Sequence, residues 1–398
     1  MSSVSAAVSA PAAAPLPRVL WPLLFGNFVI GAGVMVVPGT LNDISASLQV
    51  APSVAGQLIT AGGIVMALGA PLCAALVAGW DRRRLLAVTM LWFALLHVAC
   101  TVATTLGVLL PLRALAVLSP AIFTPQAAAC VGLLVPAHDR GRAITFIFLG
   151  WSLASVLGMP LGAYIGGVLG WRAAFLLVAT LSLVSAAWVW RTLPDGVRPP
   201  ALSRQAWADT LQSGPLMLCI GVTVLFAAGQ FVLFSYMAPY WQQVLGAGPG
   251  ALSLTFLWFG AFGLLGNVLM SRSIDRLGAP RAVLLAIGSM ALTMLLWPLG
   301  TGVFAAALIL VPWAMGCFSS NSAQQARLVA IAPGVAAGSV ALNSSAMYAG
   351  QAIGAALGGW MIAQAGFGSL HWVGLAGLLA SAAASVLAER SLRRAQPT

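Results

Sequence analysis

Long apolar stretches separated by short polar segments run along almost the whole chain. Each stretch holds about 20 or more mostly apolar residues, which is the length that a helix needs to cross a bilayer. The alternating pattern of a membrane β-barrel is not seen in this sequence, so helices are the remaining spanning structure. The sequence therefore predicts an all-α membrane protein with twelve transmembrane helices. The predicted spans are 19–41, 52–77, 85–104, 107–135, 143–169, 172–192, 214–244, 250–271, 280–299, 302–327, 335–364 and 369–388.

Arginines in the polar segments give these spans an orientation. If the N-terminus is cytoplasmic, 16 of the 18 basic residues fall in cytoplasmic segments, and only Arg113 and Arg172 fall elsewhere. Positive residues concentrate on the cytoplasmic side of membrane proteins, and one missed span would scramble this distribution. We therefore predict a multi-pass protein of the bacterial inner (cell) membrane with both termini in the cytoplasm. The 16 are Arg18, Arg82, Arg83, Arg84, Arg140, Arg142, Arg191, Arg198, Arg204, Arg272, Arg276, Arg281, Arg327, Arg390, Arg393 and Arg394.

The longest internal polar segment divides the chain into two halves of six spans each. It contains three prolines, two acidic residues and two arginines. The predicted parts are a disordered cytoplasmic tail (1–18), an N-terminal six-helix bundle (19–192), a cytoplasmic linker (193–213), a C-terminal six-helix bundle (214–388) and a cytoplasmic tail (389–398).

The two halves contain a repeated glycine pattern. Four glycines in span 5 match four in span 11 at a constant offset of 192 positions. Internal duplication is the usual construction of secondary transporters, with the substrate site between the repeats near the middle of the membrane. We therefore expect two six-helix pseudo-repeats around a central site. The matching sets are Gly158, Gly162, Gly166 and Gly167, and Gly350, Gly354, Gly358 and Gly359.

The amino-acid composition is that of a protein covered by lipid, and it shows no sign of an enzyme or a nucleic-acid-binding protein. Of the 398 residues, 61% are apolar and 6% are charged, and the mean hydropathy is +0.99. Soluble proteins carry about a quarter charged residues, so lipid must cover most of this surface. The net charge of +11 is explained by topology, and nucleic acid is not an expected partner. The five cysteines form no CxxC pair, and no P-loop or catalytic cluster is visible. No metal site, no cofactor and no enzymatic activity are predicted.

Span 5 carries the most specific motif of the chain, and a Gly-Trp-Arg sequence follows it at residues 170–172. Its residues are Gly150, Gly158, Pro160, Gly162, Gly166 and Gly167. This pattern resembles the antiporter motif of the major facilitator superfamily, within its twelve-span drug:proton antiporter and sugar-efflux group, and the resemblance covers residues 19–388. Glycines four residues apart let a neighbouring helix approach closely, and a proline bends its helix. The resemblance implies a conformational role, whereas the alternative is ordinary helix packing.

Two polar loops resemble the conserved cytoplasmic loops of the same family. Ala78 occupies the position where the family usually has an aspartate. The resemblance implies a cytoplasmic gate or latch, and the alternative is simple anchoring by positive charge. The residues concerned are Asp81, Arg82 and Arg83 between spans 2 and 3, and Asp275, Arg276 and Gly278 between spans 8 and 9.

Polar side chains inside the spans are candidates for a substrate cavity, because such groups avoid lipid. Arg113 resembles the span-4 arginine of the family, which implies a role with protons or substrate charge; the alternative is snorkelling toward the interface. Tyr236 belongs to a Tyr-x-Ala-Pro segment like that of efflux members, or else to an aromatic belt. For the amides, hydrogen bonding between helices is the alternative. The candidates are Asn27, Arg113, Gln126, Gln230, Tyr236 and Asn343.

Acidic residues are absent from the middle of every predicted span. Asp43, at the end of span 1, is the only acid that we place near the outer face. Antiporters for cationic drugs often use a carboxylate in the cavity, so we expect a neutral or anionic solute. The candidates for proton coupling are Asp43, Arg113 and His97, and the alternative for His97 is a structural buried histidine.

These observations predict a secondary active transporter that exports a small drug-like or sugar-like solute by alternating access, with proton antiport. The expected partners are the solute, protons and membrane lipid, and we expect a monomer because one chain holds both repeats. One alternative is an importer on the same fold, either a proton symporter or a uniporter. Another is a non-transporting membrane sensor or assembly partner.

Overall fold

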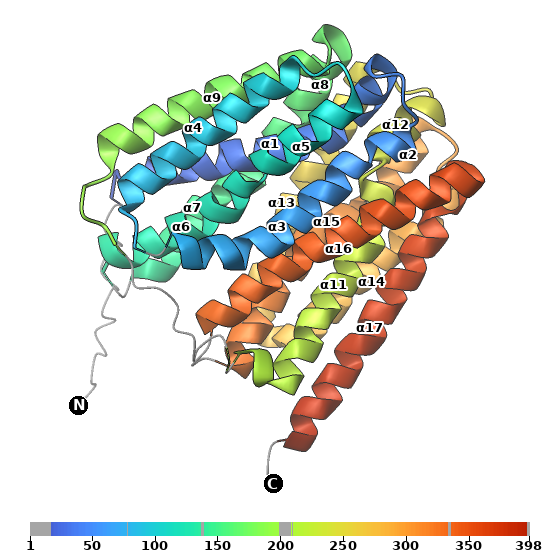
Figure 1. The fold of residues 1–398 in the computed structure, drawn as a ribbon. Coiled ribbons are helices and arrows are strands. Elements are labelled where there is room, and N and C mark those ends of the chain that lie inside the picture. The colour runs from blue at the N-terminus through green and yellow to red at the C-terminus, as the bar shows by residue number, and fades with distance from the viewer. Residues whose placement is uncertain are drawn as a thin grey trace, which may run out of the picture.

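The computed structural model describes residues 17–77, 79–136, 139–198, 208, 210–332 and 336–395. Within these ranges the chain is helical and contains no strand. Most of the predicted tail 1–18, residues 199–207 and 209 of the predicted linker, Ala78 and the last three residues lie outside them. Figure 1 shows α1 beginning and α17 ending at the same end of the molecule. We call this the inner end and the opposite one the outer end.

The helices follow the predicted spans, and several spans are built from two helical pieces. The first six spans are α1 (Leu20–Ser47), α2 (Pro52–Ala55) with α3 (Gln57–Leu76), α4 (Arg82–Thr101), α5 (Leu106–Ala116) with α6 (Leu118–Leu134), α7 (Arg140–Leu153) with the π-helical turn η2 (Ala154–Gly158) and α8 (Met159–Leu169), and α9 (Trp171–Thr192). The last six are α11 (Gly214–Phe234) with α12 (Met237–Gln243), α13 (Pro249–Leu277), α14 (Ala279–Leu296) with η3 (Trp297–Leu299), α15 (Val303–Ile331), α16 (Ala336–Ala365), and α17 (Leu370–Ala395) after η5 (Gly366–Ser369).

The predicted number of spans is confirmed. Eleven apolar helical stretches of the described chain are long enough to cross a membrane, and the last of them runs over 56 residues from Gly338 to Arg393. That stretch contains α16 and α17, joined by the short turn η5, where Gly366 adopts a φ of 69°. Figure 1 shows the chain reversing direction at this turn. The two helices therefore count as two crossings, which gives twelve.

Proline sets where span 5 departs from a regular helix. The π-helical turn η2 ends at Gly158, two residues before Pro160. A proline has no N–H, and its ring clashes with the carbonyl four residues earlier, so the helix cannot continue undistorted. A π-helical turn accommodates the irregularity and marks a point where a helix bends.

Packing divides the contacts into those within each half and those across a seam between them. In the first half, α1 contacts α7, α8 and α9; in the second, α11 contacts α16 and α17. Across the seam, α3 packs along α16, α8 packs on α13, and α1 touches α12. Figure 1 shows α3 and α16 side by side through the middle of the molecule. Any site shared by the two halves must therefore lie between these helices.

Candidate substrate pathway

Arg113 lies inside the molecule, where it compensates for a broken hydrogen bond in α1. Its side chain is 3% exposed, and its Nη2 donates to the carbonyl oxygens of Gly33 at 2.7 Å and Val34 at 3.3 Å. Pro38 has no N–H to donate to the Val34 carbonyl, its partner in a regular helix. The guanidinium therefore supplies the missing donor and connects α5 to α1. The structure places Arg113 in the interior and not in a snorkelling position.

His97 is a hydrogen-bond partner of Arg113, and the hydrogen bonds of the His97 ring define its charge. The Nδ1 atom lies 2.8 Å from the carbonyl oxygen of Phe93, and the Nε2 atom lies 3.2 Å from Nη1 of Arg113. A carbonyl only accepts and a guanidinium only donates, so Nδ1 carries the hydrogen and Nε2 accepts. This arrangement requires the neutral imidazole. It makes His97 an acceptor that orients Arg113.

A small cavity at the seam brings Arg113 together with a residue of the other half. Its volume is about 10 Å³, which is room for about one water molecule. None of the described residues that line it is acidic. The polar side chains there are Arg113 of α5 and Gln351 of α16. The lining residues are Val34, Val37, Leu58, Ile59, Gly62, Met66, Arg113, Val117 and Gln351.

Four glycines of the span-5 motif, Gly150, Gly158, Gly162 and Gly166, pack against α1, whereas Gly167 packs against Pro249 of α13. A Cβ atom on Gly158 would lie 2.8 Å from the Cβ of Ala32. A Cβ atom on Gly166 would lie 2.5 Å from the Cγ2 of Thr40. A Cβ atom on Gly150 would clash with the carbonyl oxygen of Leu24 in α1. Gly162 is looser, because its nearest neighbour would be 3.8 Å away. The motif thus allows close contact of α8 with α1 inside the first half.

The matching glycines of span 11 pack against α11 in the second half, and they also enclose Tyr236. A Cβ atom on Gly358 would lie 2.8 Å from the Tyr236 ring, and one on Gly359 would lie 2.5 Å from its hydroxyl. Across the seam, a Cβ atom on Gly56 would overlap the same ring. The Tyr236 hydroxyl donates to the Ala355 carbonyl at 2.8 Å. Tyr236 is therefore a packed seam residue, and its hydroxyl is already used within the protein.

Asn27 belongs to a polar cluster that joins three helices of the first half. Its Oδ1 accepts from the Thr124 hydroxyl at 2.8 Å, and the Trp151 indole N–H donates to the same hydroxyl at 3.2 Å. The Asn27 amide N–H donates to the Ile147 carbonyl at 3.1 Å. Asn27 is fully buried, whereas Thr124 and Trp151 are partly exposed.

Asn343 belongs to a corresponding cluster in the second half. Its Oδ1 accepts from Thr223 at 2.6 Å, and its amide N–H donates to Asn321 at 3.1 Å. These residues lie on spans 7, 10 and 11, and those of the first cluster lie on spans 1, 4 and 5. The repeat thus relates the clusters helix by helix. Both clusters lie nearer the inner end than Arg113 does.

The two remaining cavity candidates lie apart from these groups. Gln230 is 2% exposed, and its Oε1 accepts from the Trp313 indole N–H at 3.3 Å. Gln126 is 6% exposed on α6. The structure therefore brings Arg113 and His97 together, but it does not gather the predicted cavity residues at one point.

Residues that the sequence reasoning did not single out hold the seam together at the outer end. Asn42 of α1 accepts from the Gln243 side chain at 2.7 Å and donates to Gln242. Nearby, the Ser253 hydroxyl donates to the Pro160 carbonyl at 2.9 Å. A signal was present in the sequence: a proline precedes Asn42 by four residues, and another precedes Gln243 by four, at an offset of 201.

Asp43 lies next to this outer contact and does not reach Arg113. It is half-buried in the last turns of α1, and a Cβ atom on Gly166 would lie 3.4 Å from its Oδ2. Arg113 contacts α1 at residues 33 and 34, so about 14 Å of helix separates the two contacts. The two coupling candidates therefore belong to different parts of the pathway.

The predicted gate residues between spans 2 and 3 interact within the first half. Asp81 caps α4 by accepting from the Arg84 N–H at 3.2 Å, and it accepts from the Gly196 N–H at 2.6 Å. Arg83 pairs with Asp195 at 3.2 Å. Ala78 lies outside the described residues. These bonds connect the loop to the chain that follows α9.

The equivalent residues of the second half lie at the inner end of α13. Asp275 and Arg276 are exposed in its last turn, and Gly278 ends the helix with a φ of 78°. A positive φ of this kind is unfavourable for residues with a side chain, which explains the glycine at that position.

Comparison with known proteins agrees with this architecture. The family model of the Major Facilitator Superfamily matches residues 23–341. The inner membrane transport protein YdhP of Escherichia coli (strain K12) is 29% identical, over 96% of this chain and 98% of that protein. A probable sugar efflux transporter of Helicobacter pylori (strain 26695) is 30% identical, over 89% of this chain and 90% of that protein.

A solved structure supports the same fold. The crystal structure of a D-xylose–proton symporter superposes with a TM-score of 0.74 and 18% identity, over 91% of this chain and 95% of that chain. The twelve spans, the repeated glycine motif and the match to the family over most of the chain lead to one conclusion: this protein belongs to the major facilitator superfamily and is a multi-pass membrane transporter, not an enzyme.

Proposed function

We propose that this transporter exports a small neutral or anionic solute in exchange for protons. The observation that carries the proposal is the seam cavity, where Arg113 of one half meets Gln351 of the other and no acidic residue is among the described lining. A buried guanidinium repels cations and donates well to carboxylate, phosphate or hydroxyl oxygens. The Helicobacter pylori relative is a probable sugar efflux transporter, which favours export over import.

Alternating access would use the two halves, about 19–192 and 214–388, as moving units. In this structure the seam is hydrogen-bonded at the outer end through Asn42 and Gln243. The seam cavity here holds about one water, so a solute can enter only after the halves separate. The span-5 glycines would keep α8 close to α1 while the π-helical turn η2 bends. The loops at residues 81–83 and 275–278 would form the gate at the inner end, which we take to be cytoplasmic.

Asp43 is the coupling residue that fits this scheme. Its carboxylate is half-buried and directly follows Asn42, the residue that bonds across the outer seam. A proton on Asp43 removes a charge from this partly desolvated position, and the closing of the seam would favour the neutral form. His97 is held in its neutral form by its hydrogen bonds and is assigned to positioning Arg113.

Transport by purified protein in liposomes tests the substrate class. We expect an imposed proton gradient to drive neutral or anionic solutes against their gradient, and an uncoupler to stop this. Arg113→Ala should weaken the apparent affinity about 10- to 100-fold, because a hydrogen bond from a charged group contributes about 1.5–3 kcal/mol. Arg191→Ala, an exposed arginine at the end of α9, is the matched control. Unchanged affinity in Arg113→Ala would contradict the assignment.

A second measurement separates coupling from binding. Asp43→Asn should abolish gradient-driven transport but preserve exchange of labelled for unlabelled solute, because exchange needs no net proton movement. Loss of both activities would mean that Asp43 is structural. If solute movement follows the proton gradient inward, the protein is a symporting importer. An absence of flux for every solute class would favour a sensor or assembly role.

A further inference from the structure

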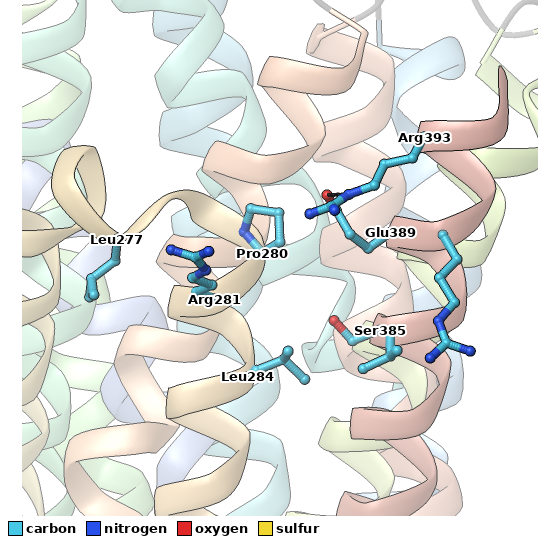
Figure 2. Close-up of a pocket in the computed structure, with 9 residues that line it drawn as sticks. Leu277, Pro280, Arg281, Leu284, Ser385, Glu389 and Arg393 are labelled. Carbon is cyan, nitrogen blue, oxygen red and sulfur yellow. Dashed lines mark hydrogen bonds and ion pairs between the residues drawn. The ribbon is translucent and has the colours of Figure 1, made fainter. Parts of the chain in front are cut away.

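A second, larger pocket opens at the inner end, between α14 and α17. Its volume is about 420 Å³. Figure 2 shows residues of the first turns of α14 on one side of it and residues of the last turns of α17 on the other. Its lining residues are Leu277, Pro280, Arg281, Leu284, Ser385, Val386, Glu389, Arg390 and Arg393. Apart from Leu277, which belongs to the proposed gate loop 275–278, no residue to which the transport mechanism assigns a role lines this pocket.

The position of the pocket is peripheral to the transport pathway. The extensive contacts of α14 are with α13, α15 and α17, and those of α17 are with α11 and α14. The pocket therefore lies on the outside of the second half, away from the seam. Exposed leucines continue from it along both helices, including Leu285 (55% exposed) and Leu387 (59%) near the pocket and Leu292 (45%) and Leu379 (56%) farther along. Such a surface faces lipid tails, which places the pocket at the depth of the headgroups.

Its electrostatic balance is strongly positive. Three arginines line it with a single carboxylate, that of Glu389. That carboxylate is already shared, because its Oε1 is 3.2 Å from Nε of Arg393 and its Oε2 is 3.5 Å from Nη2 of Arg327. No described residue forms an ion pair with Arg281 or Arg390. Two guanidinium groups are therefore available to an anion from outside.

We propose that this pocket binds the phosphate group of an anionic phospholipid. Guanidinium groups bind phosphate oxygens in a paired, planar geometry, and basic pockets between helices near a membrane surface attract anionic headgroups. The half-buried Leu284 and the exposed leucines of both helices offer the acyl chains an apolar path that a soluble phosphate would not need. Through Glu389, the site connects to the buried Arg327 of α15, so an occupied pocket would brace the inner end of the second half.

Native mass spectrometry of the full-length protein tests the site directly. In detergent, the protein should retain phosphatidylglycerol in preference to phosphatidylcholine. The double variant Arg281→Ala/Arg390→Ala should lose about tenfold or more in affinity for phosphatidylglycerol, since each arginine near an anionic headgroup contributes about fivefold. The control Arg191→Ala/Arg272→Ala removes the same charge from exposed positions that do not line the pocket, and it should bind like the wild type.

Further measurements test the role of the guanidinium groups and decide whether the bound phosphate comes from a phospholipid or from free inorganic phosphate. Arg281→Lys/Arg390→Lys keeps the charge but lacks the paired planar donors, so it should recover only part of the phosphatidylglycerol binding. Phosphatidylglycerol should raise the unfolding temperature of the wild type more than that of the double alanine variant, whereas inorganic phosphate alone should leave both unchanged. Equal lipid retention by the two alanine double variants would overturn the proposal. So would a full thermal shift with inorganic phosphate alone, because the occupant would then be a soluble anion.

Discussion

At the residue scale, the decisive interactions are those that satisfy polar groups far from water. Arg113 donates to the Val34 carbonyl of α1, which Pro38 leaves without a helical partner, and to the neighbouring Gly33 carbonyl. His97 accepts a hydrogen bond from the same guanidinium. In a low-dielectric interior an unsatisfied polar atom costs about 1–3 kcal/mol, so each member of this group fixes the position of the next. The charge of Arg113 is thereby held in one orientation at the seam.

Substitution of His97 separates a positioning role from a proton-carrying one. His97→Gln places an amide near the position of Nε2 and cannot titrate, so gradient-driven transport should stay within about threefold of wild type. His97→Phe removes the acceptor for Arg113, and the apparent affinity for the solute should fall about fivefold or more. Solute flux in liposomes, measured across a series of imposed pH gradients, distinguishes the positioning role from the proton-carrying role. If His97→Gln keeps exchange but loses gradient-driven flux, His97 carries the proton after all.

At the scale of elements, small residues and prolines determine how the helices pack. Gly158 and Gly162 belong to the same motif but have different surroundings, since a Cβ atom would lie 2.8 Å from a neighbouring side chain at Gly158 and 3.8 Å at Gly162. The first distance is a clash, and the second is an ordinary contact. The motif read from the sequence treats both positions alike, whereas the packing against α1 does not.

This difference gives a matched pair of variants within one helix. Gly158→Ala should destabilise the protein by about 1–3 kcal/mol, which is the usual cost of overpacking a filled interface. Gly162→Ala should be neutral or slightly stabilising, because alanine favours the helix by about 1 kcal/mol over glycine. Thermal unfolding of both variants in the same detergent measures the effect. Equal losses at the two sites would show that the packing against α1 is not what selects glycine.

At the scale of the whole molecule, the proposed alternating access requires the seam between the halves to open and close. Its hydrogen bonds at the outer end come from Asn42, Gln242 and Gln243, which lie at equivalent ends of spans 1 and 7. The repeat thus places polar residues opposite each other near its pseudo-symmetry axis. Side-chain amides form bonds that are specific but modest in energy, which suits a contact that would open in every cycle of the proposed alternating access.

Removal of the Asn42 side chain should weaken closure at the outer end. Two lost hydrogen bonds correspond to about 1–3 kcal/mol, which shifts the ratio of closed to open states about five- to hundredfold. Spin labels on cysteines introduced at Ala46 and Val244, in a background without the native cysteines, report the distance between α1 and the end of α12. We expect a longer distance to gain population in Asn42→Ala. An unchanged distribution would mean that apolar packing at the seam is sufficient for closure.

The orientation of the chain has its own test. Cysteines introduced at Ser203 and Thr398, which lie outside the described residues, should react with an impermeant thiol reagent from the same side of the membrane, the cytoplasmic one. Reaction from opposite sides would contradict the twelve-span topology.

The sequence by itself determined that the protein spans a membrane, how many times, and with what internal repeat. These properties follow from the length of apolar stretches, the spacing of glycines and the distribution of arginine, all of which are local or periodic along the chain. It also identified Arg113 as a candidate, since a lone charge within an apolar stretch is visible without any structure.

Only the tertiary structure decided which polar residues meet. Asn27 and Asn343 were candidates for one cavity, but each bonds within its own three-helix cluster. Gln351 gained its place beside Arg113 only when α16 packed on α3. Contacts of this kind join residues of different helices, 97 positions apart for Asn27 and Thr124, and their partners depend on helix rotation and crossing angle. A pattern along one chain carries no record of either quantity.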